Sequence, residues 1–237
     1  MRMKFKPWAR EELETSPFYI NNPEDYKNNW KNAFEKDQKL HLELGCGKGQ
    51  FIAQLSKKNP QINYIAIDLV DAMLGMAKRN VEVAYGIRQS TNKEEIENEV
   101  EKQKQVKNLK LTRYDISRIS NILGENDKIE RIYINFCNPW PRGKHHKKRL
   151  THVRQLEQYK KFLKGEIFFK TDDSTLFEAT IKYLQEADYS IEKITYDLEN
   201  EPNFWNGEEN IQTEHEKMFE NQNIKIKALI AKYGKKL

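Results

Sequence analysis

The pattern of hydrophobic and polar positions predicts alternating strands and helices from Lys39 onward. Short apolar runs that end in Gly, Asp or Asn are typical of strands, and apolar residues repeating every three or four positions are typical of helices. We expect strands at 40–44, 63–68, 109–114, 131–136 and 166–170, and helices at 50–58, 71–83, 151–163 and 174–187. This alternation predicts a parallel sheet with right-handed crossovers.

Two further strands are expected near the C-terminus, over 190–198 and 224–233. The long polar segment between them has no helical pattern, so we expect them to pair antiparallel. With the five parallel strands they make an α/β fold, a doubly wound, seven-stranded and mostly parallel Rossmann-like sheet. The last strand is antiparallel.

Residues 1–38 differ from the rest because aromatic side chains and prolines are spread among polar residues. We interpret them as an extension that packs on a single domain formed by residues 39–237, with a short helix over 25–34. Prolines at 7, 17 and 23 should break any long helix there. A highly charged helix is expected over 93–106, with Ile96, Val100 and Val106 facing inward.

Composition narrows the class of protein. Of 237 residues, 38% are hydrophobic, which favours a packed core, while no apolar run approaches the ~20 residues that span a bilayer. The basic N-terminus continues into Ala-Arg-Glu-Glu and so does not predict a secretory signal. Two cysteines, Cys46 and Cys137, are too few for a disulfide framework or a zinc site. We therefore expect a cytoplasmic protein without a metal or a membrane anchor.

A glycine turn (residues 45–49) follows the first predicted strand of the domain. Glycines at 45, 47 and 49 let the backbone approach a ligand closely, and ligands of doubly wound sheets bind at the carboxyl ends of the strands. The spacing is G-x-G-x-G, whereas a dinucleotide site normally has G-x-G-x-x-G. Glu43 stands two residues before the first glycine, where its carboxylate would repel a pyrophosphate but could pair with an ammonium group.

Acidic residues end three successive predicted strands. Asp68 could accept both hydrogen bonds of a ribose diol, and Asp115 could accept from the exocyclic amine of adenine. Together with Glu43 and Gly45, Gly47 and Gly49, they favour S-adenosylmethionine (AdoMet) as cofactor. For each acid the alternative is a helix N-cap or a surface charge.

The fourth predicted strand ends in a proline loop (residues 137–141, Cys-Asn-Pro-Trp-Pro), which a doubly wound topology would place next to the first strand. Two prolines hold this loop with little freedom, and Trp140 offers a flat face for a base or closes the edge of the core. A basic segment (residues 142–149) follows at once and holds five Lys/Arg and no acid, so the rest of the chain is formally neutral against a net charge of +5. This concentration favours a nucleic acid as partner.

These strings resemble the signature of the bacterial tRNA (guanine-N7)-methyltransferases. The resemblance runs over nearly the whole chain, and its motifs are Ile134–Thr151, the glycine turn and its flanks, Asn63–Asp68, Phe169–Asp172, Thr213–Glu216 and the N-terminal Lys6-Pro7-Trp8-Ala. It implies a Rossmann-like, AdoMet-dependent methyltransferase with tRNA as partner, acting on N7 of the variable-loop guanine, conventionally position 46. No obligatory protein partner is evident, and either a monomer or a homodimer is compatible.

Carried over by motif, the resemblance implies cofactor contacts at Glu43, Asp68, Asp115 and Asn138, with Asn138 also in the catalytic position. It implies tRNA or guanine contacts at Arg142, Asp172, Thr213, Glu214, His215 and Glu216. From the charge pattern we add phosphate contacts at Lys144, Lys147, Lys148 and Arg149. Three positions depart from the family, which usually has Asp at Asn138, Lys at Arg142 and Tyr at His215.

The chemistry of N7 bears on the change at Asn138. Guanine N7 is a lone-pair acceptor, so it can take a methyl group without first losing a proton, and no general base is obligatory. We therefore expect Asn138 to permit activity with less electrostatic support than a carboxylate gives. Three alternatives stay open: an amino-group methyltransferase of the adenine-N6 type, favoured by Asn-Pro-x-aromatic, a tRNA-binding homologue with impaired catalysis, and a nicotinamide dehydrogenase.

Overall fold

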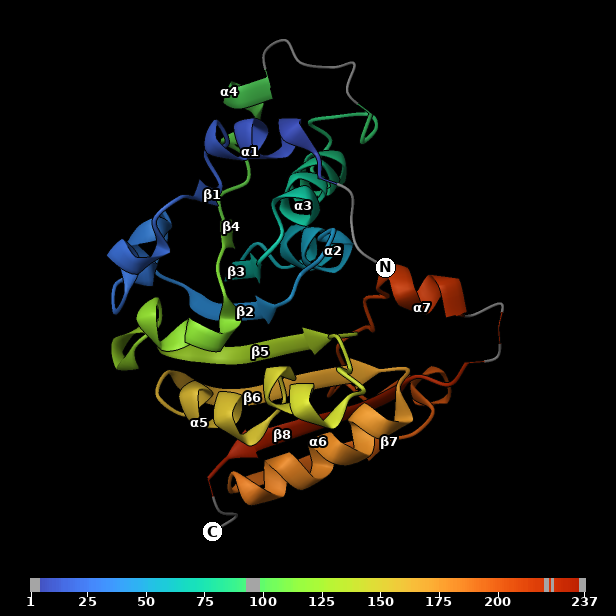
Figure 1. Cartoon of the computed structure of the whole chain (residues 1–237). Helices are drawn as coiled ribbons and strands as arrows, with labels where there is room; N and C mark the ends of the chain where they lie inside the picture. Colours follow the sequence, from blue (N-terminus) through green and yellow to red (C-terminus); the bar gives the residue numbers. More distant parts are fainter. Residues whose placement is uncertain (1–4, 93–98, 220–221, 223, 235–237) are drawn as a thin grey trace. The chain divides into compact units, whose positions relative to one another are not determined.

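The computed structural model describes residues 5–92, 99–219, 222 and 224–234, without the side chains of residues 99 and 100. The chain divides into two compact units, unit 1 (Met1–Asp127) and unit 2 (Lys128–Leu237), which differs from the predicted division at residue 38 (Figure 1). That predicted boundary stays a prediction. Within the described residues, no helix has the length and apolar character needed to cross a membrane.

Unit 1 contains four parallel strands in the order β1-β4-β3-β2. They are β1 (Tyr19–Ile20), β2 (Lys39–Leu44), β3 (Ile62–Asp68) and β4 (Leu109–Arg113). Five consecutive residues of β2 and five of β3 are buried, so both faces of these strands are covered, as is usual for parallel sheets. The polar residues of the alternation in β2, His41 and Glu43, are therefore buried as well.

Three α-helices of unit 1 are α1 (Pro7–Glu14), α2 (Gln50–Lys58) and α3 (Asp71–Ala84). The predicted helix over 25–34 is wrong: two short 3-10 helices, η1 (Pro23–Tyr26) and η2 (Trp30–Ala33), stand there instead. The cause is a long-range acceptor, because the Asp127 carboxylate accepts from the backbone N–H groups of Asn28 at 2.9 Å and Trp30 at 3.0 Å. Asn28 takes a left-handed φ of 65°, which ends the helical path.

Helix α1 was not predicted, and it packs along α3 (Figure 1). Pro7 occupies the first turn of α1, where a missing N–H costs nothing, so it starts the helix instead of breaking it. The two backbones come close at Gly75, where a Cβ would lie 2.7 Å from the Cβ of Ala9. The Arg79 guanidinium lies 3.6 Å from the Trp8 ring centroid and also binds the Glu12 carboxylate.

The charged stretch after α3 is described from α4 (Glu99–Gln103) onward. Val106 is buried as predicted, whereas the predicted inward positions of Ile96 and of the Val100 side chain lie outside the described residues. The stretch docks partly through polar groups, because Gln103 Nε2 donates to Glu82 Oε1 at 2.7 Å. Glu82 is fully buried and also binds Lys78 at 2.5 Å and Arg88 at 3.1 Å.

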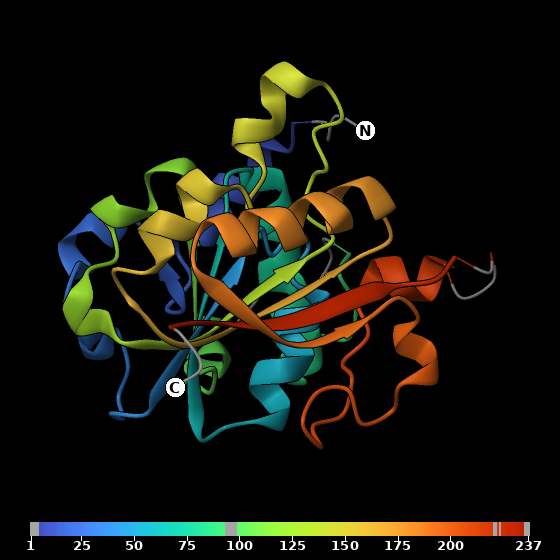
Figure 2. The same cartoon turned by 90° about the horizontal axis from the view of Figure 1, so that it is seen from below.

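Unit 2 contains four strands in the order β5-β6-β8-β7. They are β5 (Ile129–Asn135), β6 (Leu163–Thr171), β7 (Tyr189–Thr195) and β8 (Lys227–Tyr233). Strands β5 and β6 are parallel, while β8 pairs antiparallel with both β6 and β7, which confirms the predicted antiparallel end. Helices α5 (Val153–Tyr159) and α6 (Ser174–Glu186) lie side by side against this sheet (Figures 1 and 2).

The predicted α/β class with a mostly parallel sheet is confirmed, and the strand count differs by β1, which comes from the predicted extension. Several short helices were not predicted: η3 (Ile116–Asn121), η4 (Glu125–Asp127), η5 (Gly143–Lys148), η6 (Leu198–Asn200) and α7 (Glu214–Phe219). Helix α5 is also shorter than the predicted 151–163, because β6 already begins at Leu163.

Candidate active site

The glycine turn connects β2 to α2 in unit 1. Gly45, Gly47 and Gly49 have φ values of 75°, 55° and 69°, which residues other than glycine rarely adopt. Gly49 caps α2, and a Cβ there would lie 2.6 Å from the Cβ of Ala77 in α3, whereas a Cβ at Gly47 meets no atom within 4 Å. Gly49 is thus required for packing of α2 on α3, and Gly47 borders open space that a ligand could fill.

Asp68 is the last residue of β3 and Asp115 lies two residues after β4, so both stand at the carboxyl ends of their strands, as predicted. The Asp68 carboxylate accepts from Gly47 N at 3.0 Å and from Val70 N at 2.9 Å, and its backbone oxygen accepts from Tyr114 N at 3.0 Å. Asp68 therefore links the glycine turn to the segment that carries Asp115. The Asp115 carboxylate accepts from Ser117 N at 2.9 Å and caps η3, which is the structural role that the sequence left as the alternative.

The carboxylates of Glu43 and Asp68 both lie close enough to the glycine turn to act on the Cys46 thiol. Burial raises the pKa of Cys46 well above its ordinary value, and the nearby charges of Asp68 and Glu43 raise it further. Glu43 is only 2% exposed at the end of β2, and burial also raises the pKa of Asp68. Because two carboxylates act on one turn, a cationic ligand is favoured there and a pyrophosphate is disfavoured.

Two apolar side chains beside Asp68 were missed by the sequence reasoning. Leu69 is 52% exposed and Val70 is 42% exposed, directly after β3. Exposed aliphatic groups next to a carboxylate suit a ligand with a flat apolar ring joined to a sugar. The signal available in the sequence was their place after Asp68, at a strand end where ligands of such sheets bind.

In unit 2 the proline loop follows β5 and has an unusual backbone. Phe136, which directly precedes the loop, and Trp140 within it have φ values of 49° and 42°. The side-chain oxygen of Asn138 accepts from Trp140 N at 3.0 Å, which closes an Asx turn and supports the left-handed residue. An aspartate could make the same hydrogen bond, so the loop tolerates either residue. Asn138 is exposed, and its predicted role at the cofactor stays a prediction.

The basic segment contains the 3-10 helix η5, and four of its five cations are exposed: Arg142, Lys144, Lys147 and Lys148. Arg149 is a correction to the predicted phosphate contacts. Its side chain is buried, with 1% of the residue exposed, and it donates from Nε to Pro139 O at 2.7 Å and from Nη1 to Tyr183 OH at 3.3 Å. Arg149 therefore holds the proline loop and does not face a polyanion.

Trp140 of the proline loop contacts two residues of the basic segment. Lys148 Nζ is 4.9 Å from the Trp140 ring centroid, and the His145 ring is 5.7 Å away and tilted by 55°. A cation held over the indole gives a modest stabilisation of about 0.5–1 kcal/mol at an exposed site. The basic segment and the proline loop are thus one connected surface within unit 2.

The run Thr213–Glu216 forms the start of α7. Glu216 Oε2 accepts from Thr213 N at 2.7 Å and Thr213 Oγ1 accepts from Glu216 N at 3.1 Å, so the two residues form a reciprocal capping box. Both are buried, and this pair of hydrogen bonds fixes the start of the helix, while their predicted contact with tRNA stays a prediction. His215 is exposed and stacks on Phe136, with ring centroids 5.3 Å apart and planes 9° from parallel. Contacts of tRNA with Glu214, His215 and Asp172 stay predictions.

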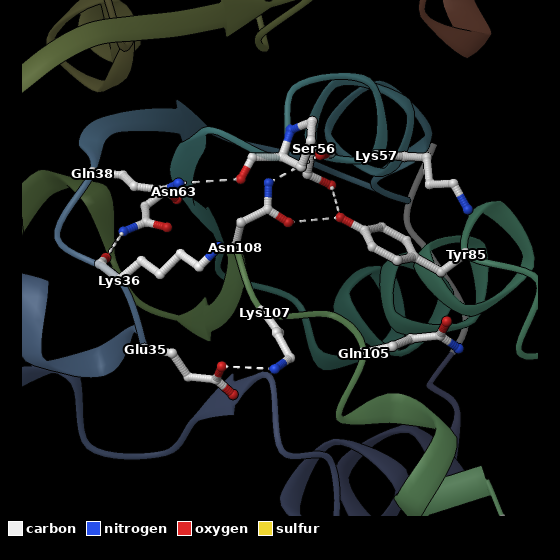
Figure 3. Close-up of a pocket in the computed structure, with 11 residues that line it drawn as sticks. Glu35, Lys36, Gln38, Ser56, Lys57, Asn63, Tyr85, Gln105, Lys107 and Asn108 are labelled. Atoms are coloured by element: carbon white, nitrogen blue, oxygen red, sulfur yellow. Dashed lines mark hydrogen bonds and ion pairs between the residues drawn. The ribbon is translucent and has the colours of Figure 1, made fainter.

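A pocket of about 290 Å³ lies elsewhere in unit 1, next to residues that precede β2, β3 and β4 (Figure 3). Its buried polar groups are used internally, because Asn108 Nδ2 donates to Ser56 O at 3.0 Å and Tyr85 OH donates to Asn108 Oδ1 at 2.9 Å. The pocket is at the amino ends of the strands and the glycine turn at their carboxyl ends. It is therefore separate from the predicted cofactor site.

Comparison with known proteins adds family information to this geometry. Residues 37–229 match the family model described as "Putative methyltransferase". The chain is 55% identical over 233 residues to a protein of Clostridium beijerinckii named tRNA (guanine-N(7)-)-methyltransferase, covering 98% of each sequence. It is 52% identical over 235 residues to one of the same name from Clostridium perfringens, covering 98% of this chain and 99% of that protein.

Solved structures of methyltransferases share the fold at low identity. The 16S rRNA methyltransferase KamB superposes with a TM-score of 0.57 at 12% identity, covering 87% of this chain and 93% of that one. A precorrin-6y C5,15-methyltransferase of Geobacter metallireducens gives a TM-score of 0.51 at 11% identity, covering 84% and 81%. Both likenesses concern the fold alone.

Proposed function

This chain belongs to the tRNA (guanine-N(7)-)-methyltransferase family, and on that premise we propose that it transfers a methyl group from AdoMet to N7 of guanine in tRNA. We further propose that the target is the variable-loop guanine at position 46 and that the protein acts in the cytoplasm. The observation that carries the proposal is the electronegative glycine turn, formed by Glu43, Asp68 and three left-handed glycines.

The residues of unit 1 fit AdoMet by the chemistry of their donors and acceptors. The ligand carries an ammonium and a sulfonium group, and the Glu43 and Asp68 carboxylates favour positive charge at this turn. Asp68 is held by two backbone N–H groups and retains lone pairs for ribose hydroxyls. Leu69 and Val70 offer apolar surface to the adenine, and Asp115 is proposed as the acceptor for its amine.

Bound AdoMet would supply an electrophilic methyl group, which the lone pair of guanine N7 accepts without prior loss of a proton. The chain therefore needs no general base, and its task is to hold the guanine and to stabilise the positive charge that grows on the purine. We propose that Asp172 binds the Watson–Crick edge of the guanine, because the two N–H donors of that edge suit one carboxylate. Asn138 is proposed to orient the reacting groups through its amide.

The RNA is proposed to bind through the exposed cations of the basic segment. Arg142, Lys144, Lys147 and Lys148 would contact phosphates, which position an RNA and do not read its sequence. The target base must leave its stack to reach a pocket, as is general for enzymes that modify bases. Trp140, at the edge of this cationic surface, is a proposed stacking partner for an RNA base.

The test is methyl transfer from labelled AdoMet to two tRNA transcripts that differ only in guanine or adenine at position 46. We expect N7-methylguanosine in the first transcript and no label in the second. Label recovered as N6-methyladenosine would favour the amino-group alternative. A protein that binds AdoMet and tRNA but transfers nothing would instead be a binding homologue.

A further inference from the structure

Lys170 is a charged residue in the core of unit 2. It lies near the end of β6 and is only 2% exposed. Its Nζ is 2.7 Å from Glu216 Oε2 and donates to Asn210 Oδ1 at 3.1 Å and to Ile211 O at 3.0 Å. Burying such an ion pair is often no more stabilising than apolar residues of similar volume. Its presence therefore calls for a role beyond stability.

All of these acceptors belong to one segment, residues 203–219, which lies between β7 and β8 in the chain. Asn210 Oδ1 also accepts from Trp205 Nε1 at 3.1 Å, and Asn210 Nδ2 donates to Glu216 Oε1 at 3.1 Å. The Trp205 ring stacks on Phe168 of β6 with centroids 4.8 Å apart. Lys170 is thus the charged centre of a buried network that fixes this segment to β6.

The network determines where α7 begins. Glu216 uses Oε2 both for Lys170 and for Thr213 N, so the ion pair and the cap of α7 share one carboxylate. The helix then carries His215, whose ring stacks on Phe136. Phe136 N in turn donates to Lys170 O at 2.9 Å, so the backbone of Lys170 holds the other half of that stack.

Asp172, the proposed reader of the guanine, follows Lys170 by two residues. The Asp172 backbone oxygen accepts from Lys227 Nζ at 3.1 Å, which fixes the chain just past the end of β6. We propose that Lys170 is a positioning residue for tRNA methylation: it locks the 203–219 segment, which carries His215, onto the strand that leads to Asp172. This inference rests on the proposed function and assigns Lys170 a role within it.

The test is a double variant, Lys170→Met with Glu216→Met, which replaces both partners by unbranched apolar side chains and leaves no unpaired buried charge. We expect it to remain folded with AdoMet affinity within about twofold of the unchanged chain, because the proposed cofactor residues other than Asn138 are in unit 1. With enzyme in excess over tRNA, we expect the single-turnover rate constant to fall on the order of 10- to 100-fold, as for misplaced reactants.

Single-turnover kinetics separate positioning from mere loss of folded protein. An unfolded fraction lowers the amplitude, whereas a misplaced guanine lowers the rate constant at full amplitude. The matched control is Lys160→Met, which removes a half-buried lysine paired with Glu157 at 2.6 Å, next to α5 in the same unit. The control should keep the rate constant of the unchanged chain.

A folded double variant that methylates at the unchanged rate overturns the inference. If the double variant does not fold, Asn210→Ala decides the matter, because it removes one acceptor of Lys170 and keeps the ion pair. A several-fold slower rate constant then supports the role, and an unchanged one refutes it. An unchanged chain that methylates no tRNA refutes the proposed function itself, and this inference with it.

Discussion

Substituting alanine at two glycines of the glycine turn separates packing from ligand binding. Gly49 and Gly47 both have left-handed backbones, with φ of 69° and 55°. A Cβ at Gly49 would lie 2.6 Å from the Cβ and 2.9 Å from the Cα of Ala77, whereas a Cβ at Gly47 meets nothing within 4 Å. The two substitutions are chemically identical, so they differ in their surroundings alone.

The structure predicts a different loss of folding stability for each of the two variants. A left-handed non-glycine residue costs about 1–2 kcal/mol, which applies to both variants. Overpacking a fixed core adds about 1–3 kcal/mol, and it applies to Gly49→Ala alone, because Ala77 is buried in α3 and cannot rotate away. Gly49→Ala should therefore lower the free energy of unfolding by about 2–5 kcal/mol, and Gly47→Ala by about 1–2 kcal/mol.

The effect on AdoMet binding should follow the opposite order: among folded proteins, Gly47→Ala should weaken it more than Gly49→Ala. The open space at Gly47 is where we place part of AdoMet, so Gly47→Ala should weaken AdoMet by at least about tenfold, or about 1.4 kcal/mol. Urea denaturation gives the two stabilities and calorimetry gives the affinity. Equal stabilities for the two variants, or a Gly47→Ala protein that binds AdoMet as tightly as the unchanged chain, would refute the reasoning.

Three further predictions follow from the same geometry. Asn138→Asp should keep the Asx turn with Trp140 and raise kcat about two- to tenfold, because a carboxylate better stabilises a cationic purine; an unchanged kcat would argue against that electrostatic role. Replacing Lys147 and Lys148 by Gln should lower the slope of log Kd for tRNA against log salt by about two units, while Arg149→Met, a buried position, should leave the slope unchanged. The affinity for AdoMet should fall with decreasing pH as the Asp68 carboxylate becomes protonated. Because burial raises the pKa of Asp68, this fall should begin at a higher pH than expected from the ~3.9 of an ordinary aspartate, and an Asp68→Asn protein should show a flatter profile.

The positions of the candidate cofactor residues at the strand ends could be predicted from the sequence, because these positions are local. Glycines and acids at strand ends are fixed by the strand itself, so Glu43, the glycine turn and Asp68 are placed as soon as β2 and β3 are recognised. From Lys39 onward, the order of the longer strands and helices was equally accessible, since each of these elements carries its own periodicity. The role of Asp115 as a cap of η3 was the alternative that the sequence itself had left open.

The errors involve residues whose partners are far away in the chain. The helix expected over 25–34 is displaced by Asp127, about a hundred residues on, and Arg149 looked like a surface cation until Pro139 and Tyr183 enclosed it. Neither contact has a local signal. Helix α7 is different, because the spacing of Thr213 and Glu216 is the sequence signature of a capping box and could have predicted it.

The most direct test of the account is equilibrium binding of labelled AdoMet to the purified full chain, with folded tRNA present and with Glu43→Gln as comparison. We expect saturable binding that weakens in Glu43→Gln, because one of the two carboxylates of the turn loses its charge. No measurable affinity of the unchanged chain for AdoMet under these conditions would contradict the proposed cofactor site.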